Sequence, residues 1–345
     1  MDDLSLGITQ TIMNKVILFH KRPLGKPSME DFKFVDEDMP IAGVGELLLK
    51  TIYVSVDPYL RGRMTTAKSY IPPFELNKPL QSTIVAQVVE SNHVEFNVGE
   101  YVTANLDWKE FQVSKGAGLN KVDETVADLS AYLGVLGMTG LTAYFGLTEI
   151  GHPKAGETVV VSGAAGAVGS IVGQIAKILG CKVIGLAGSE EKVNLLKSRF
   201  GFDEAINYKT TENITEAIAK AAPNGVDVYF DNVGGEISDA VLANINKFAR
   251  IPLCGSISHY NDTEVELGPR IQSTLVKNSV LMQGFIVSNY SSKFKEGMEQ
   301  LSHWLQEGKL DYIETIVEGF DQIPQAFIDL FEGKNSGKMI VKTTK

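Results

Sequence analysis

Three glycines in the middle of the chain have the spacing of a phosphate-binding turn. Gly163, Gly166 and Gly169 follow a β-branched run, Thr158–Val161, of the kind that forms a strand buried on both faces. After them, apolar residues recur at three- and four-residue steps, which predicts a helix with one buried face. A strand, a glycine turn and a helix bring free N–H groups and the positive end of a helix dipole to one point. We therefore predict that this stretch binds the phosphates of a dinucleotide.

The glycine spacing alone is a weak signal, because G-x-x-G-x-x-G also suits a tight turn with close packing. A second strand, Lys182–Leu186, follows the helix at once and completes a βαβ unit. It ends in Ala187, Gly188 and Ser189, where an NAD-binding chain usually has an acid for the ribose 2′-hydroxyl. Lys192 follows one turn into the next helix, so a 2′-phosphate would meet a cation and a hydroxyl. The sequence favours NADP over NAD.

Polar and glycine-rich groups stand at the ends of the later predicted strands. Because the carboxyl ends of parallel strands meet at one edge of a sheet, these groups would converge on one pocket. Plainer interpretations exist for each, since an Asn–Gly stretch can simply turn the chain and a free cysteine is often only a small buried residue. Their convergence favours the pocket. The groups are Asn207–Tyr208, Asp231–Gly235, Cys254–Ser258 and Phe285–Val287.

The composition excludes several classes of partner. With 345 residues, 44% hydrophobic and 21% charged, the chain suits two globular domains. A net charge of −10 argues against nucleic-acid and anionic-membrane partners. The two cysteines, Cys181 and Cys254, exclude a disulfide framework and a four-cysteine zinc site, and the five histidines are dispersed. We predict no metal site.

The start of the chain shows no secretory signal. Met1–Met13 lacks a basic start followed by a long apolar core, which predicts a cytoplasmic enzyme. The longest uncharged stretch, Thr158–Ala176, nearly reaches transmembrane length. Its many glycines and polar residues make the βαβ unit the better explanation.

The glycine unit lies within a longer alternation of strands and helices. Six strands alternating with helices predict a doubly wound parallel sheet, including a helix at Ile237–Phe248 and a sixth strand at Ser279–Val287. The earlier part has short strands and Pro- and Gly-bearing turns, which predict a mainly β, partly open barrel. The tail breaks the alternation and is expected to return to that barrel. The predicted divisions are residues 1–136, 137–308 and 309–345.

Several motifs occur in the order found in one known family. With these motifs and a glycine-turn sheet inserted into a β module, the chain resembles the medium-chain dehydrogenase/reductase superfamily. Within it, the match is to the zinc-independent, NADPH-dependent alkenal/one oxidoreductases, which include prostaglandin and leukotriene reductases, plant double-bond reductases and bacterial curcumin reductases. The motifs are Val56–Arg61, Gly137–Met138, Asp231–Gly235 and Gly337–Lys338, and the likeness extends from about Lys15 to Lys342.

The resemblance implies a GroES-like catalytic domain, a Rossmann domain and NADPH in the cleft between them. By motif match, the 2′-phosphate would meet Lys192 and Tyr208. The pyrophosphate would lie over Gly166, Ala167, Val168 and Gly169. The adenosine and nicotinamide halves would be lined by Met138, Asn232, Cys254, Gly255, Ser256, Ile257, Ser258, Tyr260, Phe285, Ile286, Val287 and Asn335.

Two tyrosines, Tyr53 and Tyr260, match aromatic positions that border the substrate in this family. For Tyr53, packing at the rim of a core is an equally good interpretation, and Tyr260 could pack on the cofactor alone. Thr139 replaces the proline frequent after the Gly–Met pair, and Gln81 stands where plant members often have a tyrosine. These departures leave the substrate preference open.

The expected reaction is reduction of an activated alkene, one conjugated to a carbonyl group. Hydride from NADPH reaches the β-carbon, charge collects on the carbonyl oxygen, and the α-carbon takes a proton. A tyrosine phenol can donate to that oxygen, since its ordinary pKa is about 10. Quinone reduction and a non-catalytic NADPH-binding role are the alternatives, and zinc-dependent alcohol oxidation fits least. Homodimers are common among such proteins.

Overall fold

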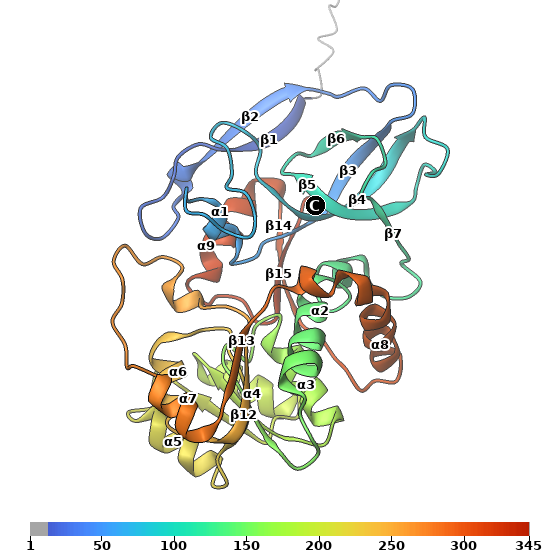
Figure 1. The fold of residues 1–345 in the computed structure, drawn as a ribbon. Coiled ribbons are helices and arrows are strands. Elements are labelled where there is room, and N and C mark those ends of the chain that lie inside the picture. Colours follow the sequence, from blue (N-terminus) through green and yellow to red (C-terminus); the bar gives the residue numbers. More distant parts are fainter. Residues whose placement is uncertain (1–12, 345) are drawn as a thin grey trace, which may run out of the picture.

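The structure is a computed structural model that describes residues 13–344. The expectation about a secretory signal concerns residues that, apart from Met13, lie outside that range. The described chain forms two modules, one above the other in Figure 1. The upper module holds the N-terminal strands in blue and cyan, and the lower holds the elements in green to orange. The last segment, in red, runs from the lower module back to the upper one.

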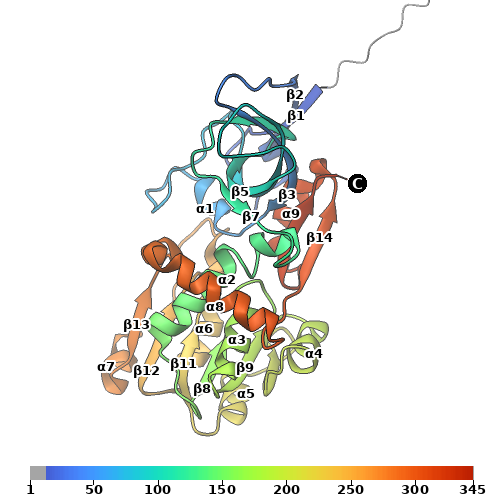
Figure 2. The same cartoon turned by 90° about the vertical axis from the view of Figure 1, so that its right-hand side faces the viewer.

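The lower module is built on a six-stranded sheet in which all neighbouring strands are parallel (Figure 2). The strands follow the chain outward from β8 in both directions, so the predicted doubly wound sheet is confirmed. In spatial order they are β10 (Glu204–Asn207), β9 (Lys182–Ala187), β8 (Thr158–Val161), β11 (Val226–Phe230), β12 (Ile245–Leu253) and β13 (Leu281–Gly284).

Helices cover both faces of this sheet because the side chains of a strand alternate between its faces. In β8, Val159 and Val161 join the core beneath α2, α3, α4 and α8, whereas Val160 joins the core beneath α5, α6 and α7. None of the helices among residues 13–344 is long and apolar enough to cross a membrane. The helices are α2 (Met138–Phe145), α3 (Gly169–Ile178), α4 (Glu190–Ser198), α5 (Ile214–Ala221), α6 (Gly235–Leu242), α7 (Gln272–Asn278) and α8 (Phe294–Gln306).

The upper module has a seven-stranded sheet and an antiparallel pair, β1 (Met13–Phe19) with β2 (Phe32–Asp38). The returning strands β14 and β15 join this sheet next to β3, and α1 (Leu60–Arg63) and α9 (Ile323–Leu330) belong to the same module. The exact divisions at residues 136 and 308 stay a prediction. The strands are β14 (Glu314–Glu318), β15 (Lys338–Lys342), β3 (Leu47–Ser55), β4 (Gln81–Ser91), β5 (Tyr101–Asp107), β7 (Asn120–Val122) and, paired with β3, β6 (Phe111–Ser114).

The predicted helix at Ile237–Phe248 is wrong in its second half. Helix α6 ends at Leu242, and β12 begins at Ile245. The side chain of Asn244 donates to the carbonyl oxygens of Ala240 (3.0 Å) and Thr215 (3.1 Å). The bond to Ala240 occupies a carbonyl group in the last turn of α6, which stabilises the stop. The bond to Thr215 connects this end to the first turn of the neighbouring helix α5.

The predicted sixth strand at Ser279–Val287 is too long. Ser279 ends α7 with a left-handed backbone (φ 51°), and β13 covers only Leu281–Gly284 before a 3-10 helix begins at Val287. The sequence prediction also missed β2. Its side chains are mostly exposed and charged, so it carries little of the apolar alternation by which strands are found.

Candidate active site

One large cavity, about 1540 Å³ in volume, lies between the two modules. This exceeds the roughly 300–1,000 Å³ of a site for a drug-sized ligand, so a dinucleotide and a second molecule both have room. Its walls come from the β8–α3 turn, the strand ends of the lower sheet, segment Val56–Tyr59 and the returning tail. Of the predicted site residues, it is lined by Met138, Gly166, Ala167, Val168, Gly169, Gly188, Lys192, Tyr208, Asn232, Cys254, Gly255, Ile257, Ser258, Tyr260, Phe285, Ile286, Val287 and Asn335.

Three predicted residues, Ser189, Ser256 and Tyr53, do not line the cavity. Ser189 is the N-cap of α4, where its Oγ accepts a hydrogen bond from the N–H of Lys192 at 3.3 Å. Tyr53 lies on β3 opposite Lys342 and packs against a small apolar cluster of the upper module. The structure therefore does not bring Tyr53 together with Tyr260. Packing at a core rim accounts for its position.

The glycine turn is packed so tightly that it excludes side chains. A Cβ atom on Gly169 would lie 2.4 Å from the carbonyl oxygen of Gly163, which itself has φ of +58°. Within the described part of the chain, the N–H groups of Ala167 and Val168 donate to no protein acceptor. Free N–H groups at the start of α3, without side chains in the way, suit a phosphate.

Two cations and a phenol surround the end of β9. The hydroxyl of Tyr208 lies over Gly188, whose Cβ would be only 2.7 Å from it. The Nζ of Lys192 donates to the carbonyl of Gly333 at 2.7 Å. Burial lowers the pKa of Lys192 and the positive charge of Lys209 lowers it further. Both lysines line the cavity, so a 2′-phosphate would relieve their repulsion. Sequence reasoning missed Lys209, although it directly follows Tyr208.

The acid that follows β11, Asp231, is part of the framework and does not line the cavity. Its buried carboxylate accepts hydrogen bonds from the hydroxyls of Ser162 (3.0 Å) and Tyr229 (2.8 Å) and from the N–H groups of Val233 (3.0 Å) and Gly234 (2.9 Å). These bonds fix the loop that follows the strand. Ser162 holds the predicted cavity residue Asn232, whose N–H donates to the Ser162 hydroxyl (2.9 Å) and whose side-chain amide donates to the Ser162 carbonyl (2.8 Å).

The returning tail connects the glycine turn to the upper module. The N–H of Gly337 donates to the carbonyl of Ala165 at 2.7 Å. The next residue, Lys338, is buried, and its Nζ donates to the carbonyl of Val56 (2.9 Å) and lies 3.2 Å from the Oδ1 of Asp57. Burial lowers the pKa of Lys338, an effect that the charge of Asp57 opposes. These hydrogen bonds thus connect the glycine turn to the upper module through the returning tail.

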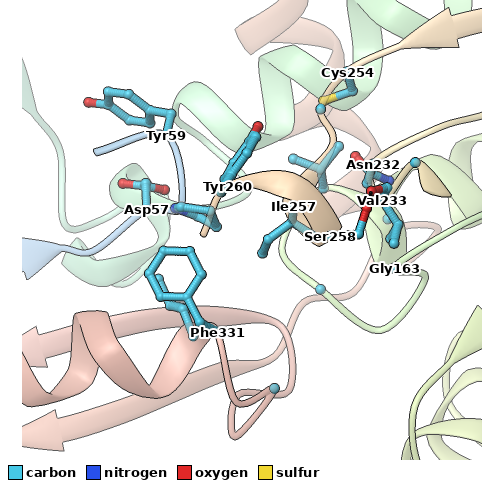
Figure 3. Close-up of a pocket in the computed structure, with 18 of the residues that line it drawn as sticks. Asp57, Tyr59, Gly163, Asn232, Val233, Cys254, Ile257, Ser258, Tyr260 and Phe331 are labelled. Carbon is cyan, nitrogen blue, oxygen red and sulfur yellow. Dashed lines mark hydrogen bonds between the residues drawn. The ribbon is translucent and has the colours of Figure 1, made fainter. Parts of the chain in front are cut away.

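Another part of the cavity wall is rich in tyrosines, as Figure 3 shows for Tyr59 and Tyr260. Burial raises the pKa of Tyr260 and of Tyr59, so both phenols stay protonated at neutral pH and can donate. Tyr70 also lines the cavity. Sequence reasoning missed Tyr59 and Tyr70, although Tyr59 lies inside the Val56–Arg61 motif. Burial also raises the pKa of the Cys254 thiol, to about 12.

A cluster of three side chains in the following loop has metal-ligand types. The Nδ1 of His259 lies 3.0 Å from a carboxylate oxygen of Asp262 and 3.0 Å from one of Glu266. Among residues 13–344 it is the one group of three His, Cys, Asp or Glu side chains within such reach. It lacks the further histidine or cysteine usual in catalytic zinc sites, and both acids are exposed. Metal independence stays a prediction.

Known proteins match this chain along most of its length. Two family profiles match in order, "N-terminal domain of oxidoreductase" at residues 15–122 and "Zinc-binding dehydrogenase" at residues 167–303. YfmJ of Bacillus subtilis is 57% identical over 97% of this chain and 99% of its own. The NADPH-dependent curcumin reductase of Escherichia coli is 41% identical over 95% and 96%. The chain belongs to the zinc-independent alkenal/one oxidoreductases of the medium-chain dehydrogenase/reductase superfamily.

A solved structure extends the match to the fold and the cofactor of this oxidoreductase. CurA from Vibrio vulnificus, determined in complex with NADPH, superimposes with a TM-score of 0.91 at 46% identity, covering 96% of this chain and 99% of its own. The GroES-like and Rossmann fold class and the NADP cofactor are therefore confirmed. The chain is an NADP-dependent oxidoreductase.

Proposed function

We propose that this oxidoreductase reduces the carbon–carbon double bond of α,β-unsaturated aldehydes and ketones. When bound, NADPH supplies the hydride that adds to the β-carbon. The negative charge then collects on the carbonyl oxygen, which a positioned donor stabilises. Tyr260 carries the proposal, because it lines the same cavity as the glycine turn and burial raises its pKa. Its phenol therefore keeps its proton for this hydrogen bond at neutral pH.

The other cavity residues hold the cofactor in this proposal. The N–H groups of Ala167 and Val168 receive the pyrophosphate, and Lys192, Lys209 and Tyr208 receive the 2′-phosphate. The close packing at Gly169 and the free N–H groups support the first assignment. The positive charge of Lys209, which lowers the pKa of Lys192, and the place of both lysines in the cavity wall support the second. Further cavity residues of the lower module, among them Met138, Asn232 and Phe285, shape the nicotinamide end.

The test is NADPH consumption with a panel of enals, enones and quinones, before and after exhaustive chelation of the enzyme. We expect turnover of enals and enones that chelation leaves unchanged. Turnover of quinones alone would favour the alternative activity. Binding of NADPH without turnover of any acceptor would indicate a non-catalytic protein.

We also propose a cytoplasmic homodimer that pairs through β13. Within the described residues, β13 is the edge of its sheet and pairs only with β12. Leu281 on this strand and Val276 on α7 are exposed apolar side chains beside that edge, and an exposed strand edge is a template for another strand. Light scattering tests this, since Leu281→Lys should shift a dimer to the mass of a monomer.

A further inference from the structure

One loop of the upper module, residues Thr65–Pro73, forms part of the cavity wall near the tyrosines, and we call it the strap. Its side chains Tyr70 and Ile71 line the cavity, as do Tyr59 and Tyr260. Burial raises the pKa of Tyr260, and the nearby groups Cys254 and Tyr70 raise it further. Tyr70 therefore lies close to the group that would hold the substrate carbonyl. The strap belongs to the upper module and the loop of Tyr260 to the lower one, and side chains of both line the same cavity.

The first anchor of the strap is Arg22. One guanidinium nitrogen donates to the carbonyl oxygens of Met64 and Thr65, both at 3.2 Å, and the other donates to that of Phe74 at 3.0 Å. These three carbonyls stand at the two ends of the strap. A single side chain thus ties its beginning to its end.

The second anchor is Arg63, which is buried. Its Nε donates to the carbonyl of Pro72 at 3.1 Å, and its guanidinium lies 3.9 Å from the ring centroid of Phe74. Such a stacked cation contributes to holding the ring in place. Because both ends of the strap are fixed by these bonds, its middle residues keep a defined position in the cavity wall.

Tyr70 at the middle of the strap is free to contact a ligand. The residue is 62% exposed, and in the part of the chain that the structure describes its hydroxyl makes no hydrogen bond to another residue. An exposed ring beside a cavity gains free energy when an apolar group covers it. Together with Ile71, it offers an apolar surface next to Tyr260.

We propose that the strap selects the substrate, with the Tyr70 ring covering an aryl or other large apolar substituent on the activated alkene. The inference rests on the proposed function, because the reacting bond must lie beside Tyr260. It goes further by naming the preferred substrates, which are alkenes conjugated to an aromatic group rather than short aliphatic enals. The ring makes the contact, and the proposal requires no hydrogen bond from the hydroxyl.

The test compares two substrates, benzylideneacetone and crotonaldehyde, in wild type, Tyr70→Ala and Tyr70→Phe. Leu76→Ala is the matched control, since Leu76 is exposed close to the strap but does not line the cavity. The readouts are KM, kcat and the dissociation constant of benzylideneacetone from the enzyme–NADP⁺ complex by calorimetry. We expect Tyr70→Ala to raise KM and the dissociation constant for benzylideneacetone about five- to tenfold, the size of one aromatic contact. Crotonaldehyde values should stay within about twofold, and Tyr70→Phe and Leu76→Ala should resemble wild type.

Two results would contradict the role of the strap in substrate selection and leave the proposed function standing. One is an equal change for both substrates, or for neither, in Tyr70→Ala. The other is a loss in Tyr70→Phe as large as in Tyr70→Ala, which would assign the contact to the hydroxyl. If the wild type neither binds nor reduces either alkene, the proposed function fails and the strap inference fails with it.

Discussion

The Nε of Arg61 donates to the side-chain oxygen of Asn261 at 3.2 Å, and so joins the upper module to the loop that holds Tyr260. Arg61 is buried, and its Nε and Nη2 also donate to the carbonyl of Gly25, the shorter contact at 2.8 Å. Because Asn261 directly follows Tyr260, this contact helps to set where the phenol lies. The two modules therefore cooperate in placing the proposed oxyanion donor.

Removing this contact should slow the chemical step rather than cofactor binding. Hydrogen bonds to charged groups are worth about 1.5–3 kcal/mol, so Asn261→Ala should lower the single-turnover rate of hydride transfer roughly tenfold or more. The effect has the same direction as that of Tyr260→Phe, because both weaken the donor to the developing charge. NADPH affinity should stay near wild type. Asn92→Ala, which removes side-chain bonds within the upper module, is the control, and an equal slowing there would refute the role of Asn261.

Losing one partner of the buried pair Lys338–Asp57 should lower the free energy of unfolding strongly. Lys338→Met leaves the Asp57 carboxylate buried without its cation, which typically costs about 3–5 kcal/mol. Adding Asp57→Asn should restore much of that loss, because no charge then remains buried. Urea unfolding measures both. The exposed pair Lys121–Glu100 provides the comparison, and Lys121→Met should cost less than about 1 kcal/mol. Similar losses in the two single variants would contradict this account.

The choice of NADPH over NADH should depend on Lys192. A charge-assisted hydrogen bond to phosphate is worth about 1.5–3 kcal/mol, so Lys192→Ala should weaken NADPH binding by roughly ten- to a hundredfold and leave NADH nearly unchanged. Lys209→Ala should act in the same direction. Fluorescence titration with both cofactors measures this, with Lys197→Ala as the control on the same helix. Equal weakening of NADPH and NADH would place the 2′-phosphate elsewhere.

The cavity wall made by the lower module could be predicted from sequence, and most of the wall made by the upper module could not. The turn at Gly163–Gly169 and the strand ends recur with the alternation of strands and helices, so the pattern predicts that they lie at one edge of the sheet, where they line the cavity. The opposite wall arises only when the upper module packs against Tyr260. Tyr53 and Tyr59 look alike in sequence, yet β3 ends between them at Ser55 and only Tyr59 lines the cavity. Lys209 was missed because nothing in the sequence around it distinguishes it from an ordinary surface lysine.

The thiol of Cys254 should resist the reactive alkenes that the cavity is proposed to bind. Burial and the charge of Asp231 raise its pKa to about 12, so at pH 8 only about one thiol in ten thousand is ionised. Since the thiolate is the nucleophile, alkylation in the absence of NADPH should be slow and should rise about tenfold per pH unit from pH 7 to pH 9. Mass spectrometry after timed exposure to an enal measures this, with Cys254→Ala as the control. An alkylation rate that levels off below pH 9 would show that the thiol has an ordinary pKa.

The position of the transferred hydrogen tests most directly the proposal that this oxidoreductase reduces the carbon–carbon double bond. The enzyme is supplied with NADPH deuterated at C4 of the nicotinamide, in separate reactions for its two faces, and with benzylideneacetone. Nuclear magnetic resonance then locates the deuterium in the product. We predict a saturated ketone with deuterium on the β-carbon from one of the two labelled cofactors, and a solvent hydrogen on the α-carbon. Deuterium on the carbonyl carbon of an allylic alcohol would contradict reduction of the carbon–carbon double bond.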